Sequence, residues 1–244
     1  MSFGLIIRNA DGALVVDSEF LNYALREEFT QNISVTTTFT QTTLSFSSPI
    51  ATSEPPLVAV KWPANNDLFI WGVRPIGSPG NWTGFGIYHQ AIPSAGTVTF
   101  EFSVFEANPS GVEGFGLVAR NADGDATFDS GFTPLEISAF IDPTGWNTLS
   151  TSLPVPGYRV TFYSKTSPSI GSGMILSCHR FGDLVYPGGV EGSPPVAIAA
   201  YGYGYGTNNT IRLCLTLDTG TPNVNPSALS TPAVYISPMT LVGF

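Results

Sequence analysis

The chain has 244 residues, of which only 11% are charged, with 9 Lys or Arg against 18 Asp or Glu. An average soluble domain carries roughly 25% charged residues, so this composition is unusually neutral. The 26 glycines and 20 prolines, with many Ser and Thr, leave little material for helices. A hydrophobic content of 43% argues against intrinsic disorder, because it supplies apolar surface to bury. The composition therefore disfavours helical bundles, coiled coils and doubly wound α/β enzymes.

The formal net charge of −9 argues against a nucleic-acid binder, whose affinity depends on Lys and Arg. No apolar stretch approaches the roughly 18 residues needed to cross a bilayer, so we expect no membrane insertion. The N-terminal apolar run has no basic region before it and contains Arg8, and a secretory signal is therefore not expected. Cys178 and Cys214 are too few for a disulfide scaffold, and we expect free buried thiols.

The first element of the chain belongs to an internal repeat. Residues 3–20 read FGLIIRNADGALVVDSEF, and residues 115–132 read FGLVARNADGDATFDSGF. At an offset of 112, eleven of these eighteen positions are identical: Phe3/Phe115, Gly4/Gly116, Leu5/Leu117, Arg8/Arg120, Asn9/Asn121, Ala10/Ala122, Asp11/Asp123, Gly12/Gly124, Asp17/Asp129, Ser18/Ser130 and Phe20/Phe132. Self-similarity at a fixed offset indicates duplication. The repeat predicts two related units, 1–112 and 113–244.

Each copy of the repeat predicts a β-hairpin. In the first copy FGLIIRN is one strand, NADG is the turn and ALVV is the returning strand. Gly12 and Gly124 are expected in the left-handed turn conformation, where a Cβ would cost about 1 kcal/mol or more. Gly4 and Gly116 are expected where another strand or chain approaches closely. Arg8 and Arg120 end their strands, and each is expected to bind a nearby carboxylate or carbonyl group.

The remaining elements are predicted to be short strands separated by Pro, Gly, Asn and Ser. Those of the first unit are expected at 31–46 as a strand pair, and at 57–60, 68–73, 85–90 and 97–107. Those of the second unit are expected at 157–164, 174–181, 196–206, 210–217 and 233–244. The sequence thus predicts an all-β protein of two tandem, related antiparallel β-sandwich-like domains.

Two segments carry more specific expectations. Residues 21–29 have a helix-like composition, which fits either a short helix or a connecting strand. PPLVAV at 55–60 is echoed by PPVAIA at 194–199, with 27 residues more than the repeat offset between the two. We therefore expect an insertion in the second unit, with these two strands at equivalent places in the same sheet.

The sequence shows no catalytic, metal-binding or cofactor-binding pattern. His89 and His179 are isolated, whereas zinc requires three or four ligands. Asp residues gather in the repeat, and NADGDATFD at 121–129 superficially resembles a calcium loop. Turn geometry explains the Asn and Asp of this loop, and we favour the turn over calcium and over glycosidase chemistry. The chain is therefore expected not to be an enzyme.

YGYGYG at 201–206 is the most distinctive candidate for a contact surface. In a strand Tyr201, Tyr203 and Tyr205 share one face, while the glycines leave the other face flat. Such rings contact a protein partner or stack on sugars, and Trp82 is a further candidate. The alternative is that the rings cover a neighbouring sheet.

The opening pattern resembles a poorly characterised family of tailed-phage proteins from the tail-tip, baseplate and fibre region. The match is carried by Met1, Phe3, Gly4, Leu5, Asn9, Asp11, Gly12, Asp17 and Ser18, and in the second unit by Phe115, Gly116, Leu117, Asn121, Gly124, Asp129 and Ser130. The resemblance implies a virion structural protein of the phage tail, present in the host cytoplasm during assembly. Its implied partners are other tail proteins and further copies of itself, with a host surface glycan or protein as another partner in attachment.

Two other functions remain open on the sequence alone. A capsid decoration protein would share the β-sandwich and the low charge. A glycan-binding module for receptor recognition would use the tyrosine row and Trp82 as stacking platforms. A polysaccharide-degrading enzyme is a third and more remote alternative.

Overall fold

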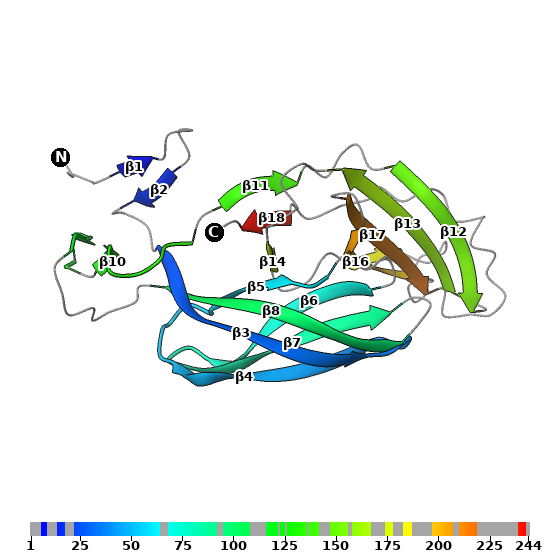
Figure 1. Ribbon diagram of the computed structural model, residues 1–244, viewed down its shortest axis with the longest axis horizontal. Helices are drawn as coiled ribbons and strands as arrows, with labels where there is room; N and C mark the ends of the chain where they lie inside the picture. Colours follow the sequence, from blue (N-terminus) through cyan, green and yellow to red (C-terminus); the bar gives the residue numbers. More distant parts are fainter. Residues whose placement is uncertain are drawn as a thin grey trace.

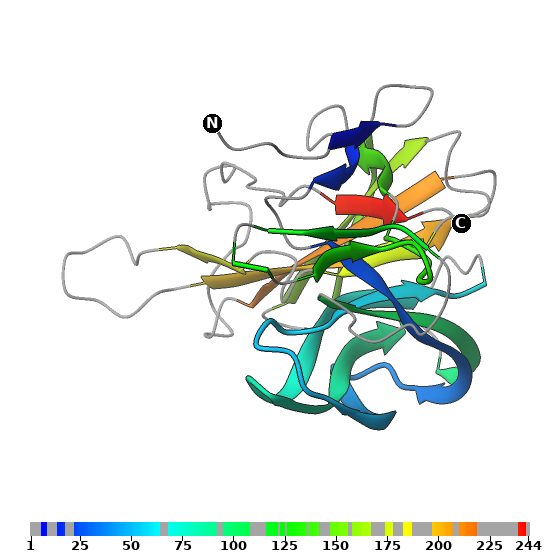
Figure 2. The same cartoon turned by 90° about the vertical axis from the view of Figure 1, so that its left-hand side faces the viewer.

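Figures 1 and 2 show the chain, a computed structural model, as an assembly of strands. The structure describes residues 22–63, 68–91, 95–107, 116–121, 123–124 and 126–135 in full, and ten further strands by their backbone. Among the described residues there is no helix, and every pair of hydrogen-bonded strands is antiparallel. The prediction of an all-β, antiparallel fold is confirmed for this part of the chain.

The strands of residues 1–112 are β1 (Ile6–Arg8), β2 (Leu14–Asp17), β3 (Tyr23–Val35), β4 (Thr40–Ile50), β5 (Leu57–Lys61), β6 (Leu68–Ser78), β7 (Asn81–Ala91) and β8 (Gly96–Ala107). Those that follow are β9 (Val118–Arg120), β10 (Ala126–Asp129), β11 (Ile137–Ile141), β12 (Asn147–Val155), β13 (Tyr158–Thr166), β14 (Met174–Ser177), β15 (Asp183–Tyr186), β16 (Ala197–Gly206), β17 (Thr210–Asp218) and β18 (Met239–Val242).

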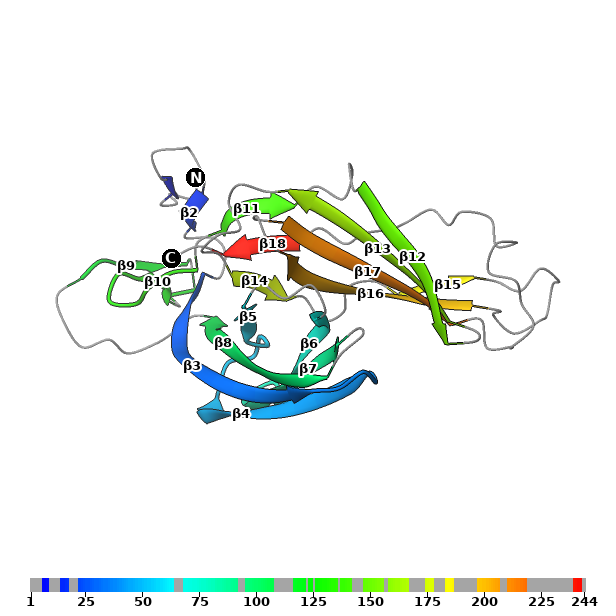
Figure 3. The ribbon, with the colours of Figure 1, turned by 45° about the vertical axis from the view of Figure 1, so that its right-hand side comes forward.

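Strands β3 to β8 form two sheets that face one another. One contains β5, β8 and β3 in that order, and the other contains β6, β7 and β4. Figure 3 shows the two sheets curving around a common interior. The segment 31–46, expected as a strand pair, divides into the end of β3 and the start of β4, but these strands belong to different sheets and do not pair. The turn between them therefore carries the chain from one layer to the other.

Aromatic side chains from both sheets fill this interior. Phe29 of β3 and Phe102 of β8 lie with their ring centroids 6.2 Å and 5.2 Å from that of Phe85 on β7. Phe46 of β4 approaches the same ring to 5.8 Å. Each fully buried Phe contributes about 1.5–3 kcal/mol relative to an exposed one. The alternation of aromatic residues along these strands therefore holds the two layers together.

The residues of β8 alternate between buried and exposed only in the first half of the strand. Phe100 and Phe102 are buried while Thr99 and Glu101 are exposed, as in a strand with one wet face. Beyond Ser103 both faces are buried. Tyr23, Leu25, Leu57 and Leu135 pack around Ala59 and Phe105 there, which covers the second face.

Within the segment 21–29, which fitted either a helix or a strand, residues 23–29 form the start of β3. It pairs with β8 from Tyr23↔Ala107 to Val35↔Gly96, with an irregularity between Leu25 and Glu27. Long-range pairing with β8 thus overrides the helix propensity of Leu, Arg and Glu in this segment.

Both sheets continue beyond residue 112. The first becomes a six-stranded sheet with the order β11-β18-β14-β5-β8-β3, because β14 pairs with β5. The second becomes an eight-stranded sheet, whose path β12-β13-β17-β16-β6-β7-β4 joins at Tyr203↔Ile70 and also takes in β15 beside β16. Strands from before and after residue 112 thus share both sheets, and the division into two related domains stays a prediction.

The two repeated segments form two hairpins with the same pairing. The first hairpin is β1–β2, with Ile6↔Asp17, Ile7↔Val16 and Arg8↔Leu14. The second hairpin is β9–β10, with Val118↔Asp129, Ala119↔Phe128 and Arg120↔Ala126. Adding 112 to the first set of pairs gives the second, including the position of the irregularity. The hairpin prediction is confirmed in both copies.

One expectation about the later strands is wrong. PPLVAV leads into β5, which lies in the six-stranded sheet, whereas PPVAIA leads into β16 of the eight-stranded sheet. The two Pro-Pro segments therefore do not occupy equivalent places. A Pro pair followed by small aliphatic residues can precede any buried strand, so the motif does not specify which sheet receives it.

Candidate functional site

The tyrosine row lies on a strand inside the eight-stranded sheet. Tyr201, Tyr203 and Tyr205 of β16 pair with residues of β17, and Tyr203 also pairs with Ile70 of β6. Ile70 is a core residue, only 2% exposed. The row therefore lies between two paired strands, and its contact with a ligand or partner stays a prediction.

Trp82 lies on β7, separated from β16 by β6. Its indole N–H donates a hydrogen bond of 2.9 Å to the carbonyl oxygen of Thr52, which also accepts one of 2.9 Å from the Gly80 amide. The indole thus fastens the segment after β4 to the β6–β7 turn. Ile70, which pairs with Tyr203 on one side, pairs on its other side with His89, seven positions after Trp82 on β7. The structure therefore does not bring Trp82 and the tyrosines together.

A different aromatic cluster, which the sequence did not single out, lies at the β3–β4 turn. The Phe39 side chain is 57% exposed, and its ring stacks on Tyr88 with centroids 5.6 Å apart. The edge of Trp71 meets the same ring at 6.2 Å. Phe39 interrupts a run of threonines at 36–43, and this was the available signal. We call Phe39, Tyr88 and Trp71 the aromatic cluster.

Hydrogen bonds hold the turn that carries Phe39. The hydroxyl of Thr36 lies 2.8 Å from that of Thr40, and the amide of Gln90 donates to the carbonyl oxygen of Thr37 at 2.9 Å. The backbone amide of Ala91 donates to the carbonyl of Thr36 at 2.8 Å. The exposed ring is therefore presented by a turn fixed to β7.

Two polar side chains lie at Gly86, two positions before Tyr88 of the aromatic cluster on β7. Gln41 lies over Gly86, where a Cβ would collide with the Gln41 amide. Arg74 is exposed and is the pairing partner of Gly86 on the neighbouring strand. An aromatic ring beside an amide and a guanidinium group can stack on a sugar and donate hydrogen bonds to it.

His89 is the only described histidine, and it is buried. It is 0% exposed, and its Nε2 lies 2.9 Å from the hydroxyl oxygen of Thr42. Burial lowers the pKa of His89 below its usual value, because desolvation disfavours the charged ring. Its Nδ1 has no hydrogen-bond partner. A neutral histidine enclosed in a sheet has no access to a substrate, and His179 lies outside the described residues.

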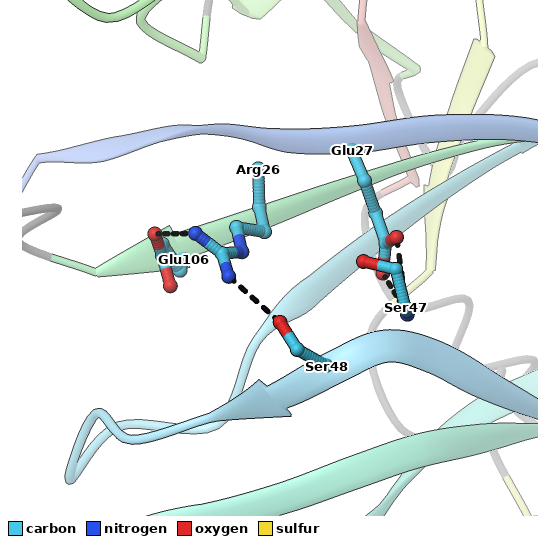
Figure 4. Close-up of polar contacts among 5 residues, drawn as sticks. All are labelled: Arg26, Glu27, Ser47, Ser48 and Glu106. Atoms are coloured by element: carbon cyan, nitrogen blue, oxygen red, sulfur yellow. Dashed lines mark hydrogen bonds and ion pairs between the residues drawn. The ribbon is translucent and has the colours of Figure 1, made fainter.

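Arg26 is the centre of a polar contact between the two sheets (Figure 4). Its guanidinium lies 3.7 Å from a carboxylate oxygen of Glu106 on β8 and donates to the hydroxyl of Ser48 on β4 at 2.9 Å. The next residue, Glu27, accepts the backbone amide of Ser47 at 3.2 Å. Burial raises the pKa of Glu106, while Arg26 acts in the opposite direction. This group links the edges β3 and β4, and we read it as structural.

The second hairpin is held by side-chain to backbone hydrogen bonds. The Asn121 side chain accepts the Asp123 amide at 3.0 Å, and Gly124 has a φ of 89°. Arg120 donates to the carbonyl oxygen of Gly124 at 2.8 Å, as expected of a strand-ending arginine near a carbonyl. Among the described residues no His, Cys, Asp and Glu side chains gather in a group that could hold a metal ion. Turn geometry accounts for the Asn and Gly of NADG in this copy.

The predicted close approach at Gly116 is found within the hairpin itself. A Cβ at Gly116 would lie 2.6 Å from the Ser130 hydroxyl oxygen. That hydroxyl accepts the amide of Leu117 at 2.7 Å, and the Leu117 carbonyl accepts the Ser130 amide at 2.9 Å. Gly116 therefore makes room for the hydrogen bonds that close the open end of the hairpin.

The second hairpin is also attached to the start of β3. Asn22 donates its side-chain amide to the carbonyl of Thr127 at 2.7 Å, and Ala24 forms a bridge with Pro134. A shallow pocket lies along this join, lined by Asn22, Tyr23, Ala24, Thr127, Phe128, Asp129, Phe132 and Pro134. The join places the residues after β10 beside the first residues of β3.

Comparison of the chain with protein-family models, with curated proteins and with solved structures finds no match. In the part of the chain that the structure describes, no helix has the length and apolar character needed to cross a bilayer.

Proposed function

We propose that the chain contains two copies of one unit, each a hairpin followed by six strands. The counterparts in chain order are β3 and β11, β4 and β13, β5 and β14, β6 and β16, β7 and β17, and β8 and β18. β12 and β15 are then additions to the second copy.

The strand order of the sheets supports this proposal. With each strand replaced by its counterpart, β11-β18-β14-β5-β8-β3 reads the same from either end. The path β13-β17-β16-β6-β7-β4 does so too, with β12 as an extra edge strand. A palindromic order is expected when two like units meet across a two-fold axis.

On this basis the protein is a non-enzymatic structural component of a bacteriophage tail tip, baseplate or fibre complex, which connects fibres to the tail or takes part in host attachment. The observation that carries this function is the opening hairpin, the element that resembles the tail proteins, which occurs twice with one register. The chain carries few charges, and half of its described strands lie between two neighbouring strands. A surface of low charge suits a protein that packs within an assembly.

Labelling of phage particles tests the location. Particles would be incubated with a gold-conjugated antibody to this chain and imaged by negative stain, with an antibody to the major capsid protein as the matched control. We expect gold at the end of the tail. Gold over the capsid would instead support a decoration protein, and an absence of gold on every particle would contradict a virion role.

The aromatic cluster favours glycan recognition as a second candidate function. Phe39 is more than half exposed and stacks on Tyr88, and Gln41 and Arg74 lie over and opposite Gly86, two positions before Tyr88 on the same strand. An exposed ring with polar side chains on neighbouring strands suits a sugar ring. A glycan array probed with the wild type, with Phe39→Ala and with Tyr203→Ala would test this. Loss of binding in Phe39→Ala alone identifies the aromatic cluster, loss in Tyr203→Ala alone identifies the tyrosine row, and no binding by the wild type contradicts the function.

A further inference from the structure

Most identities between the two hairpins have an internal explanation in the second copy. The side chain of Ser130 accepts the backbone amide of Leu117, and that of Asp129 accepts the backbone amide of Gly131 at 2.9 Å. Arg120 and Asn121 are bound within the turn. These residues are needed to form the hairpin, whatever surrounds it.

Leu117 is different, because its side chain is 50% exposed although Leu occupies the same position in the first copy, Leu5. The next residue, Val118, is 41% exposed, and its counterpart Ile6 is also β-branched and aliphatic. Among the described residues only Phe39 is a further exposed large hydrophobic side chain. Two adjacent exposed aliphatic residues, kept in both copies, indicate a contact beyond the hairpin.

Two features of the fold identify another copy of this hairpin as the fitting surface. Within the chain, β2 of the first hairpin lies against β10, its counterpart in the second. In addition, β9 pairs only with β10, and no other described strand lies along its second edge. The motif therefore already contacts its own copy through β2 and β10, while among the described strands the second edge of β9 has no neighbour.

We propose that two copies of this chain associate through β9, with Leu117 and Val118 of one chain packed against the same residues of the other. A two-fold contact places the same segment of the two chains side by side, so the aliphatic side chains of one chain meet those of the other, with Leu117 and Val118 on opposite faces of the paired strands. Cross-strand aliphatic pairs of this kind stabilise antiparallel strands. This contact would serve the structural role proposed above, and its biological purpose rests on that role. The association itself can be measured with the purified chain, whether or not the protein is located in the tail.

Cross-linking identifies the occupant directly. Full-length Leu117→Cys would be oxidised mildly at micromolar concentration, with Phe39→Cys as the control, and disulfide-linked peptides would be mapped by mass spectrometry to separate them from links through Cys178 or Cys214. We expect peptides joined through position 117 in both chains, at a yield several-fold above that of position 39. Equal yields, or no 117–117 peptide, would overturn the proposal.

Sedimentation of the unmodified chain provides the second readout. We expect a concentration-dependent dimer whose Kd rises at least about tenfold in the double variant Leu117→Ser, Val118→Ser. Phe39→Ser should leave the Kd unchanged. A wild-type chain that is monomeric up to about 100 μM would refute the contact. Such a result would leave the tail labelling intact, and capsid labelling would leave the dimer intact, so the two failures are distinct.

Discussion

Leu135 donates its backbone N–H to the carbonyl oxygen of Tyr23 at 2.8 Å, and these residues are 112 positions apart, the offset of the repeat. The neighbouring bridge, Ala24↔Pro134, runs antiparallel. When equal positions of two like segments pair antiparallel, a local two-fold axis passes between them. The join at the start of β3 therefore supports the same internal symmetry as the strand order of the two sheets.

A designed disulfide tests this register. Ala24 and Pro134 form a non-hydrogen-bonded pair, because Leu25 and Leu135 donate to the residues that flank them, so their Cα atoms should lie about 4.5 Å apart. We expect Ala24→Cys, Pro134→Cys to oxidise within one chain, and closing so long a loop stabilises it by up to about 4 kcal/mol.

The control for this register is Ala24→Cys, Thr133→Cys, whose second position points to the opposite face of the strand. It should oxidise poorly under the same conditions. Equal oxidation of both pairs, measured by peptide mapping, would contradict the register.

Substitution of Gly77 and of Gly80 by Ala distinguishes the cost of backbone strain from the cost of a steric collision. Gly77 has a φ of 128°, and a Cβ there would collide with the Asn81 carbonyl oxygen and lie 2.8 Å from the Cα of Trp82. Gly80 has a φ of 84° but open space around it. Gly80→Ala should cost about 1 kcal/mol from strain, and Gly77→Ala at least about 2 kcal/mol. Urea unfolding of both variants measures the difference, and equal losses would show that the collision relaxes.

The stability of the fold should depend on pH through His89. Its folded pKa lies below the ordinary 6.5, so between these values the unfolded chain binds more protons than the folded chain. The free energy of unfolding therefore rises with pH across this window, by at most about 1.4 kcal/mol per pH unit, and is retained above it. Unfolding at pH 5.5 and 7.5 should show the change in the wild type.

Two variants isolate this titration. His89→Leu should remove the difference between the two pH values, while Thr42→Val, which deletes only the hydrogen-bond partner, should keep it. A pH response that persists in His89→Leu would assign it to another group.

Arg26 should matter more to stability than Lys61, a cation of similar exposure, because the side chain of its partner Glu106 is 12% exposed whereas that of Glu101 is 52% exposed. Glu106 has a folded pKa above 4.5, so the folded chain retains a proton that the unfolded chain releases, and stability falls as the pH rises through that window. Arg26→Met removes the charge that opposes this rise in the pKa of Glu106. The free energy of unfolding at neutral pH should therefore fall by roughly 1 kcal/mol more in the variant than in the wild type. Urea unfolding at pH 4.0 and 7.5 measures it.

The matched control is the pair formed by Lys61 and Glu101, whose charged atoms lie 3.1 Å apart at the surface. Lys61→Met should change stability by less than about 0.5 kcal/mol at either pH, because water screens an exposed pair. If the free energy of unfolding falls by the same amount in both variants, the contact of Arg26 with Glu106 contributes no more to stability than an exposed ion pair, and the prediction is wrong.

The hairpins could be predicted from sequence because their causes are local. Asn121, Gly124 and Arg120 make their hydrogen bonds within the NADG turn or its flanks, so the segment specifies its own structure. Seven strands, β5 to β8, β13, β16 and β17, also agree with their predicted segments within a few residues, because short runs of β-branched and aromatic residues mark them.

Sheet membership and the Arg26 contact could not be predicted in this way. Nothing in the residues of β5 or β16 specifies the neighbour that each strand meets across more than a hundred positions. Leu25 and Glu27 flank an irregularity that becomes visible only when β3 is aligned with β8. Phe39 was missed because its exposure depends on the layer change between β3 and β4, which has no local signature.

The seam between the parts of each sheet has a mechanical consequence. Within the two sheets, the described strands before and after residue 112 are joined by three residue pairs between β5 and β14 and by one between β16 and β6. Outside the sheets, the bridge between Ala24 and Pro134 joins the same two parts. By contrast, β3 and β8 pair along nearly their whole length. A load that pulls the two parts away from each other therefore acts on few hydrogen bonds, and the molecule should yield along this line while the aromatic interior between the sheets of β3 and β4 stays closed.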